Sequence, residues 1–217
     1  MSSWLSLFDT SGQASRRPIP KRTPNAASRR SQRLVPRAEQ VEARVLLSEF
    51  RINTYTTAAQ SANSIAMDAN GDFVVTWTSF GQEEGFDIFA QRYNAAGIAQ
   101  GAEFRVNDYT TGPQRDSAVA MDAAGNFVIV WNSNNQSGPG SGWDVYAKRY
   151  DAAGATIDGE FPVNTYTNGN QFASAVAMDA DGDFVVAWDS DNQDGSGLGV
   201  YARRFDGVGV PNRSISG

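Results

Sequence analysis

Three aspartates in the last part of the chain, Asp179, Asp181 and Asp183, stand at alternate positions. Calcium binds six to eight oxygen ligands, so this spacing predicts a calcium site. Two similar segments occur earlier, and the second of them has Ala124 at its centre. Gly182 is fourth in its segment, whereas the EF-hand loop has its glycine sixth. A tight hairpin turn explains the same residues and remains the alternative to calcium.

A second candidate lies in three loops that differ among otherwise similar segments, at residues 78–87, 132–144 and 189–199. Binding residues are commonly carried on such surface loops. Trp143 is the one tryptophan of residues 49–217 that lies outside a repeated strand position. A tryptophan beside Asn and Ser can stack on a sugar ring, so Trp143 is a predicted ligand-binding residue for a glycan. Packing against a neighbouring segment is the alternative.

The composition excludes several chemistries, because the chain has no cysteine and no histidine. Disulfides, Cys/His zinc sites, cysteine nucleophiles and Ser-His-Asp triads are therefore ruled out. Glycosidase chemistry by a pair of carboxylates is compatible with the composition. No two carboxylates are singled out for it, and we predict that the chain has no catalytic residues and is not an enzyme.

The charge is unevenly distributed. Residues 1–48 have nine Lys/Arg against three Asp/Glu, a net charge of +6, whereas residues 49–217 have nine against twenty-one, a net charge of −12. Phosphate contacts need a basic face, so the acidic part is not expected to bind nucleic acid.

The acidic part consists of three repeats, at about 49–102, 103–159 and 160–210. Each contains three shared blocks, represented by EFRINTYT, MDANGDFVVTW and IFAQRYNAAG in the first copy. The MDANGDFVVTW-type blocks are 54 and 57 residues apart, and a period of this length is typical of repeat architectures. Residues that are identical in all copies serve packing most simply, and residues that differ are where a single-copy function must lie.

The strand patterns predict the fold. FVVTW (73–77), FVIVW (127–131) and FVVAW (184–188) are apolar on both faces, so each must be covered on both sides. In each repeat one further strand precedes this segment and two further strands follow it. We therefore predict an all-β, β-propeller-like domain over 49–217, with three four-stranded antiparallel blades that form a partial ring. A stacked solenoid is the alternative.

Residues 1–48 are predicted to be a disordered, basic N-terminal segment of export type, because 11–37 is rich in Arg, Ser and Pro without hydrophobic periodicity. The opening twelve residues are too short and polar to span a membrane. Residues 33–50 resemble the LEPR-XLL motif near the start of many exported bacterial proteins, with Val for the leading Leu and Ala for Pro. The resemblance implies export. A short amphipathic helix over 38–48 is the alternative.

Residues 49–210 also resemble tandem repeats of the form MDADGDFVVxW…YAxRYD…EFxVNTYT in large bacterial surface proteins. This resemblance implies an extracellular or cell-surface location and a non-enzymatic structural, adhesive or ligand-binding role. The alternative is a fragment of a carbohydrate-active enzyme, a glycosidase or lyase, on a propeller scaffold. A comparison with the Asp-box of sialidase-type propellers is loose, since five residues separate Gly182 from Trp188.

The recurring arginines Arg92, Arg149 and Arg204 could form an acid-sugar clamp, but their repetition favours structural ion pairs. We expect their partners to be the repeated glutamates. These are Glu49, Glu103 and Glu160.

The order of the blocks predicts complementary ends. Residues 49–56 form a fourth-strand block that precedes any complete repeat, whereas the last repeat is not followed by one. Propellers have about four to eight blades, so three leave an open arc. We expect a homodimer that completes a six-bladed ring, or alternatively a longer array of which this chain is a piece.

Overall fold

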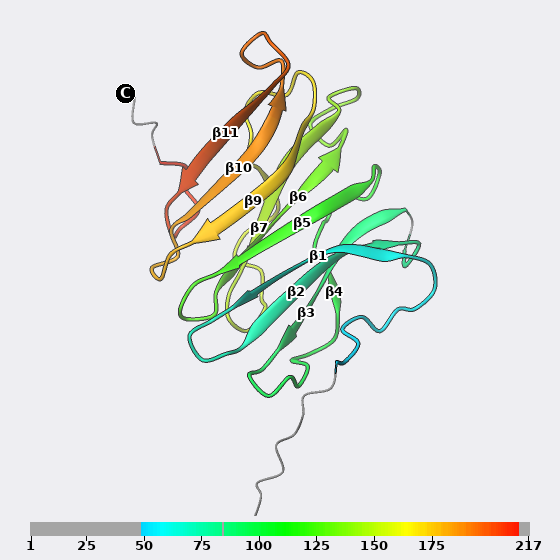
Figure 1. Cartoon of the computed structure of the whole chain (residues 1–217), viewed down its shortest axis with the longest axis vertical. Helices are drawn as coiled ribbons and strands as arrows, with labels where there is room; N and C mark the ends of the chain where they lie inside the picture. The colour runs from blue at the N-terminus through cyan, green and yellow to red at the C-terminus, as the bar shows by residue number, and fades with distance from the viewer. Residues whose placement is uncertain (1–48, 84, 213–217) are drawn as a thin grey trace, which may run out of the picture. The chain divides into compact units, whose positions relative to one another are not determined.

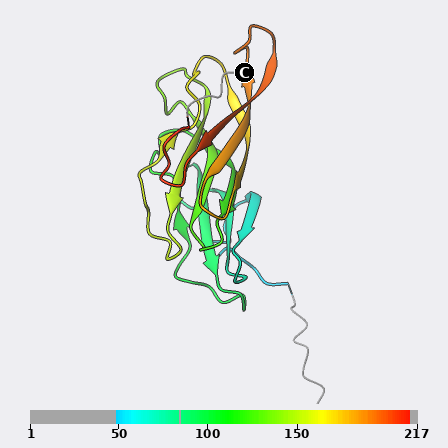
Figure 2. The ribbon, with the colours of Figure 1, turned by 90° about the vertical axis from the view of Figure 1, so that its left-hand side faces the viewer.

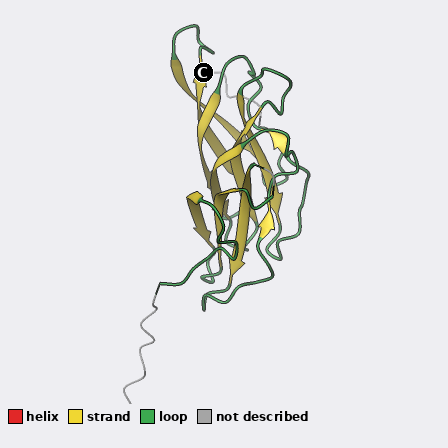
Figure 3. Ribbon diagram, turned by 90° about the vertical axis from the view of Figure 1, so that its right-hand side faces the viewer, coloured by secondary structure: helices red, strands yellow, loops and turns green. Residues whose placement is uncertain are grey.

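The computed structural model describes residues 49–83 and 85–212. The predictions of disorder, of an export motif and of a short helix in residues 1–48 lie outside the described residues. Strands, turns and loops make up the described part, which confirms the all-β prediction (Figure 3). None of its segments is a helix long and apolar enough to cross a membrane.

Three antiparallel sheets are formed in chain order (Figure 1). The first contains β1 (Gln60–Met67), β2 (Phe73–Phe80), β3 (Phe86–Tyr93) and β4 (Phe104–Arg105). The second contains β5 (Gln114–Met121), β6 (Phe127–Asn134), β7 (Trp143–Tyr150) and β8 (Phe161–Pro162). The third contains β9 (Gln171–Met178), β10 (Phe184–Asp191) and β11 (Leu198–Phe205). We call them blades 1, 2 and 3.

The hairpin between the first two strands of each blade is fixed by an aspartate and a glycine. In blade 3 the carboxylate of Asp179 accepts hydrogen bonds from the backbone N–H groups of Asp181 and Asp183, at 3.1 and 3.0 Å. Gly182 adopts φ of +88°, a left-handed conformation that side chains other than glycine disfavour. The predicted turn is therefore formed.

The fourth strand is shorter than its sequence block. In blade 1 only Phe104 and Arg105 pair with β3, and Val106 adds one backbone hydrogen bond to Ile88 at 2.8 Å. Asn107 then ends the strand, because its side chain accepts the Ile88 N–H at 2.8 Å. Within the described residues blade 3 has three strands and lacks this fourth one, as the order of the sequence blocks predicted.

The blades follow one another in chain order, from the cyan strands to the orange ones (Figure 2), and β5 contacts both β1 and β9. The predicted coverage on both faces is complete in β6. Its Phe127, Ile129 and Trp131 pack against blade 1, while Val128 and Val130 pack against blade 3. The arrangement is that of consecutive propeller blades in an arc that does not close on itself.

Candidate functional site

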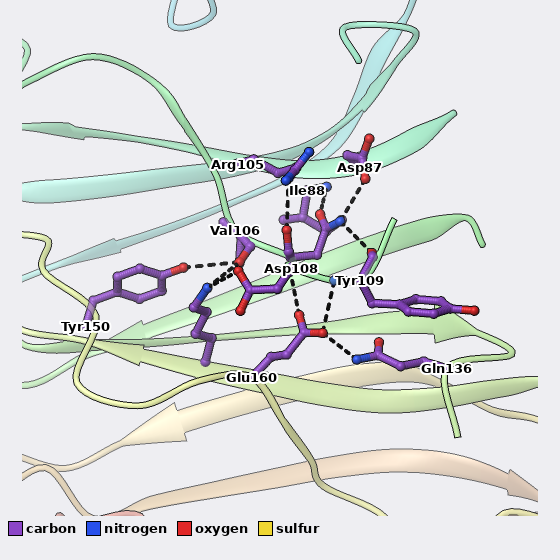
Figure 4. A network of polar contacts seen from close by, with 11 residues as sticks. Asp87, Ile88, Arg105, Val106, Asp108, Tyr109, Gln136, Tyr150 and Glu160 are labelled. Carbon is purple, nitrogen blue, oxygen red and sulfur yellow. Dashed lines mark hydrogen bonds and ion pairs between the residues drawn. The ribbon is translucent and has the colours of Figure 1, made fainter. Parts of the chain in front are cut away.

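The side chains that connect neighbouring blades form a network, drawn in Figure 4 for blades 1 and 2. Glu160 accepts hydrogen bonds from the backbone N–H groups of Asp108 and Tyr109, at 2.7 and 3.1 Å, and from the side chain of Gln136. Lys148 donates to the backbone oxygen of Val106 at 3.1 Å and to Asp108 at 2.8 Å. The junction therefore depends on groups from both blades.

Asn107 is the centre of the same junction and is 1% exposed. Besides the Ile88 N–H, it donates from Nδ2 to Asp87 at 2.7 Å and to the backbone oxygen of Tyr109 at 2.9 Å. Burial raises the pKa of the Asp87 carboxyl, and the hydrogen bond from Asn107 partly offsets this effect. Asn164 makes the corresponding three contacts after β8, with Val145 and Asp144 of β7 and with the backbone oxygen of Tyr166.

The expected ion pairs between repeated arginines and repeated glutamates do not form, and that prediction is wrong. Arg92 donates to the backbone oxygens of Ala152 and Ala153, in the next blade. Arg149 pairs with Asp158, and Arg204 pairs with Asp183 at 2.8 Å. Glu103 and Glu160 instead accept hydrogen bonds from backbone N–H groups at the junctions.

The first predicted site is accounted for by local hydrogen bonds. The carboxylate of Asp179 is engaged by the turn, and that of Asp183 accepts from the Gly207 N–H at 2.8 Å and from Arg204. In the part of the chain that the structure describes, no group of three or more acidic side chains is arranged to hold a metal ion. Calcium binding at Asp179, Asp181 and Asp183 stays a prediction.

Its test is the unfolding temperature with calcium and with a chelator. Bound calcium stabilises the folded state by mass action, so binding at these aspartates predicts a rise that Asp181→Ala removes. Equal unfolding temperatures with calcium and with chelator would assign the three aspartates to the turn alone.

The second predicted site residue, Trp143, lies at the start of β7 and lines an open groove of about 480 Å³ between blades 2 and 3. This volume is within the range of small-molecule sites. Six residues line the groove: Arg115, Asp116, Asn132, Trp143, Asn170 and Phe172. We call it the Arg115 groove.

Arg115 is the basic group of this groove. Its guanidinium lies 4.0 Å from the ring centre of Phe86 and 5.8 Å from that of Trp143. Its Nε is buried without a hydrogen-bond partner among the described residues. The residue stands at a β-bulge of β5, and Asp116 beside it has φ of +56°, an uncommon conformation that often occurs at functional sites.

Two hydrogen-bond acceptors of the groove, Asp116 and Asn132, lie beside Arg115. Asn132 is 2% exposed and donates from Nδ2 to Asp116 at 3.3 Å, whereas its Oδ1 is buried and unpartnered in the described part. Asn170 accepts the backbone N–H of Trp143 at 3.2 Å and so fixes the start of β7.

The groove consists largely of residues that the repeats do not share. The position of Arg115 is Ser61 in blade 1 and Phe172 in blade 3. The position of Trp143 is occupied by Phe86 in blade 1 and by Leu198 in blade 3. The position of Asn132 is occupied by Thr78 in blade 1 and by Asp189 in blade 3. Sequence analysis found Trp143 but missed Arg115 and Asn132, although their departure from the repeat was visible.

The second notable surface is the open edge of blade 1. The fourth strand of blade 1, β4, packs against the following blade, blade 2. Residues 49–53 pack against blade 1 in the same way and make the equivalent aromatic contact. The ring centres are 5.6 Å apart for Phe50 and Tyr93, 5.5 Å for Phe104 and Tyr150, and 5.8 Å for Phe161 and Phe205. The Tyr93 hydroxyl donates to the Ile52 oxygen at 3.0 Å. The segment thus occupies the place of a fourth strand for a preceding blade.

The third surface is the opposite open edge, along β11. Ile88 of β3 and Val145 of β7 are 0% exposed, because a fourth strand and a following blade cover them. The equivalent residue of β11, Val200, is 80% exposed. Val185 of β10 is 41% exposed, whereas its equivalents Val74 and Val128 are fully buried.

Comparison with solved structures supports the blade arrangement. The Hadza microbial sialidase Hz136 matches 71% of this chain and 38% of its own, with a TM-score of 0.53 and 15% identity. The endo-arabinase from Bacteroides thetaiotaomicron VPI-5482 matches 79% of this chain and 62% of its own, with a TM-score of 0.47 and 12% identity. The chain thus spans less than two thirds of either protein.

At 15% identity the likeness to the sialidase shows the propeller fold alone. No protein-family model and no curated protein matches the chain.

Proposed function

We propose that the chain is a non-enzymatic, exported module of the cell surface with a structural or adhesive role, completed by pairing with a second copy. One observation carries the proposal. Residues 49–53 are held on blade 1 in the position of a fourth strand, while no such strand pairs with β11 of blade 3 among residues 49–83 and 85–212. Unpaired edges of this kind are usually covered or blocked.

The internal junctions indicate how two copies would fit. Between blades 1 and 2, Val74, Ile88 and Ala90 pack on Phe127, Ile129 and Trp131. At the open ends the equivalents of the first three residues are Val185, Val200 and Ala202. The equivalents of the last three are Phe73, Val75 and Trp77, which lie with Ile52 on the far face of blade 1. Val75 and Trp77 are already buried in the single chain, at 6% and 4% exposure, whereas Val200 of blade 3 is exposed. The two open ends therefore carry the same complementary residue types as a buried junction.

The polar contacts are complementary as well. Glu103 accepts the Thr54 N–H at 2.7 Å, as Glu160 accepts that of Asp108. At the start of blade 3 the N–H group equivalent to those of Thr54 and Asp108 is that of Thr165. No glutamate follows blade 3 in the described residues to accept it. Glu49 of a second copy would supply the missing carboxylate.

Two copies would form two such junctions about a two-fold axis. The product is a ring of six blades, within the range of about four to eight that propellers adopt. Closure would pair both open edges, whereas one copy alone leaves apolar residues such as Val200 of blade 3 in solvent. We therefore propose the closed homodimer.

The non-enzymatic part of the proposal rests on the Arg115 groove. Glycosidases typically use a pair of carboxyl groups, and Asp116 is the one carboxylate among the residues that line this groove. Export to the cell surface rests on the resemblance of the sequence to bacterial surface repeats. It is tested by accessibility of the chain to added protease on intact cells.

The assembly is tested by light scattering on the full chain. We expect a mass twice that of the 23.4 kDa chain. Glu49→Ala is expected to weaken the dimer with little change in stability, because Glu49 is exposed at the open edge. Glu160→Ala removes the partner of two backbone N–H groups inside the chain and is expected to cost about 1–3 kcal/mol of stability. A full-length protein that stays monomeric at high concentration would contradict the proposal.

A further inference from the structure

We propose that the Arg115 groove is a binding site for a sugar acid, a ligand that combines a carboxylate with hydroxyl groups. This inference is independent of the assembly proposed above. It rests on three features of one groove: a cation without an acidic partner, a buried acceptor without a donor, and an aromatic surface.

The cation of the groove, Arg115, has no ion-pair partner among the described residues. The four ion pairs among the described residues use Arg105, Lys148, Arg149 and Arg204. Arg115 is in none of them, although its domain is strongly acidic and Asp116 is its neighbour in sequence. Its guanidinium is held on the ring of Phe86, and its Nε lacks an acceptor in the described part. A planar guanidinium fits a carboxylate through two parallel hydrogen bonds.

The acceptors select a hydroxylated ligand. The Oδ1 of Asn132 is buried without a donor, which costs free energy unless a ligand or water donates to it. Asp116 is a second acceptor on the same wall. Sugar hydroxyls can donate to both groups, whereas a simple carboxylate such as acetate has no hydroxyl to offer. Asp116 would also disfavour a second carboxylate on the ligand.

The aromatic surface selects a ring. Trp143 lines the groove, and its backbone N–H donates to Asn170, which fixes the backbone at the start of β7. The indole face of tryptophan binds the apolar face of a sugar ring by dispersion and exclusion of water. A neutral sugar could use Trp143 and Asn132 but would leave the guanidinium of Arg115 without an anion. The combination therefore favours a uronic acid over a neutral hexose.

The test compares three ligands: glucuronate, glucose, which lacks the carboxylate, and acetate, which lacks the sugar ring and its hydroxyls. Binding to the full chain is followed by NMR of the tryptophan indole N–H signals. A charged hydrogen bond contributes about 1.5–3 kcal/mol, so we expect glucuronate to bind at least about tenfold more tightly than glucose. Acetate is expected to bind more weakly still.

The variant Arg115→Ser installs the residue that blade 1 has at this position, Ser61, and should fold. It is expected to remove the preference for glucuronate. Arg204→Ser removes an equal charge outside the groove and should leave that preference intact. Equal affinity for glucuronate and glucose, acetate binding as tight as glucuronate, or no binding of any of the three would each overturn the proposal.

Two further readouts separate this inference from the proposed function. The titrations are repeated with Val200→Asp, a substitution at the assembly edge and outside the groove, so that loss of the dimer and loss of the ligand are seen separately. Incubation with an oligosaccharide that contains glucuronate is followed by product analysis. Binding without turnover is the expected result, and turnover lost in Arg115→Ser would show that the groove is an active site and overturn the binding-only proposal.

Discussion

The substitution Val200→Asp is expected to leave the chain folded and to make it monomeric. In a single copy Val200 is 80% exposed, so a polar replacement should change the stability by no more than about 0.5 kcal/mol. In the proposed dimer it takes the position of Ile88 and Val145, which are fully buried. An unpaired charge buried there costs about 3–5 kcal/mol, which weakens dimerisation by more than about 100-fold.

Sedimentation over a range of concentrations measures this effect. Ile157→Asp is the matched control, because Ile157 is 49% exposed and belongs to blade 2, which contributes no open edge. The control is expected to sediment as the unmodified protein does. A Val200→Asp variant that keeps the dimer mass would show that β11 is not part of the contact.

The substitution Trp131→Ala is expected to cost about 3–5 kcal/mol, a large part of the stability of an ordinary domain. Trp131 is fully buried between blades 1 and 2, and its indole N–H donates to Gln114 at 2.9 Å. Removal of the ring leaves a cavity and also leaves the Gln114 side chain without its donor. Trp131→Phe keeps most of the apolar volume and should cost less.

Denaturant unfolding followed by circular dichroism gives the measurement. Trp77→Ala, at the equivalent position of blade 1, is the comparison. Trp77 packs in a smaller buried cluster with Val75 and Phe89, and its indole N–H has no hydrogen-bond partner among the described residues. In the monomeric Val200→Asp background its loss should therefore cost less than that of Trp131. Equal costs at the two positions would contradict the view that the smaller cluster of blade 1 stabilises the chain less than the junction at Trp131 does.

Much of the fold was predictable because the determining signals are local. Phe, Val and Trp alternate on the strand at 184–188, and Gly182 marks the turn before it, so strand and hairpin follow from neighbouring residues. The missing fourth strand was predictable from the order of the blocks alone. Its reduction to two paired residues was not, because the side chain of Asn107 replaces the next backbone pair.

Contacts between blades were harder to predict, since they depend on how the sheets stack. Arg149 was expected to pair with a repeated glutamate, but the next blade places backbone oxygens of Gly207 and Val208 beside it. Glu103 and Glu160 accept from backbone N–H groups instead. These backbone oxygens and N–H groups are about one repeat away in sequence from the side chains they meet, so spacing along the chain does not reveal the pairs.

In the Arg115 groove, too, a residue marked by a local signal was predicted, and a residue defined by contacts between blades was not. Trp143 was predicted because it lies in a variable loop, where single-copy residues are easily recognised. Arg115 lies in a strand block, and its bulge and its contact with Phe86 of blade 1 become visible only in the folded chain. Comparison of each strand position among the three repeats would have found it.

The central claim, that residues 49–53 of one copy pair with β11 of another, can be tested by directed disulfide formation. The chain has no cysteine, so a designed pair reports on one contact. Phe104 pairs with Ala90, and Phe161 with Ala147, across the two internal fourth strands. The equivalent pair between copies is Phe50 and Ala202. Directly opposed strand residues lie about 4.5–5.5 Å apart at Cα, which suits a disulfide.

The measurement is non-reducing electrophoresis of the full-length Phe50→Cys/Ala202→Cys variant after mild oxidation. Each single variant and the Val200→Asp triple variant serve as controls. We expect the double variant to run as a covalent dimer without larger species, because a ring of two copies uses both pairs. A ladder of higher multimers would indicate an open array, and a protein that stays monomeric after oxidation would contradict the pairing itself.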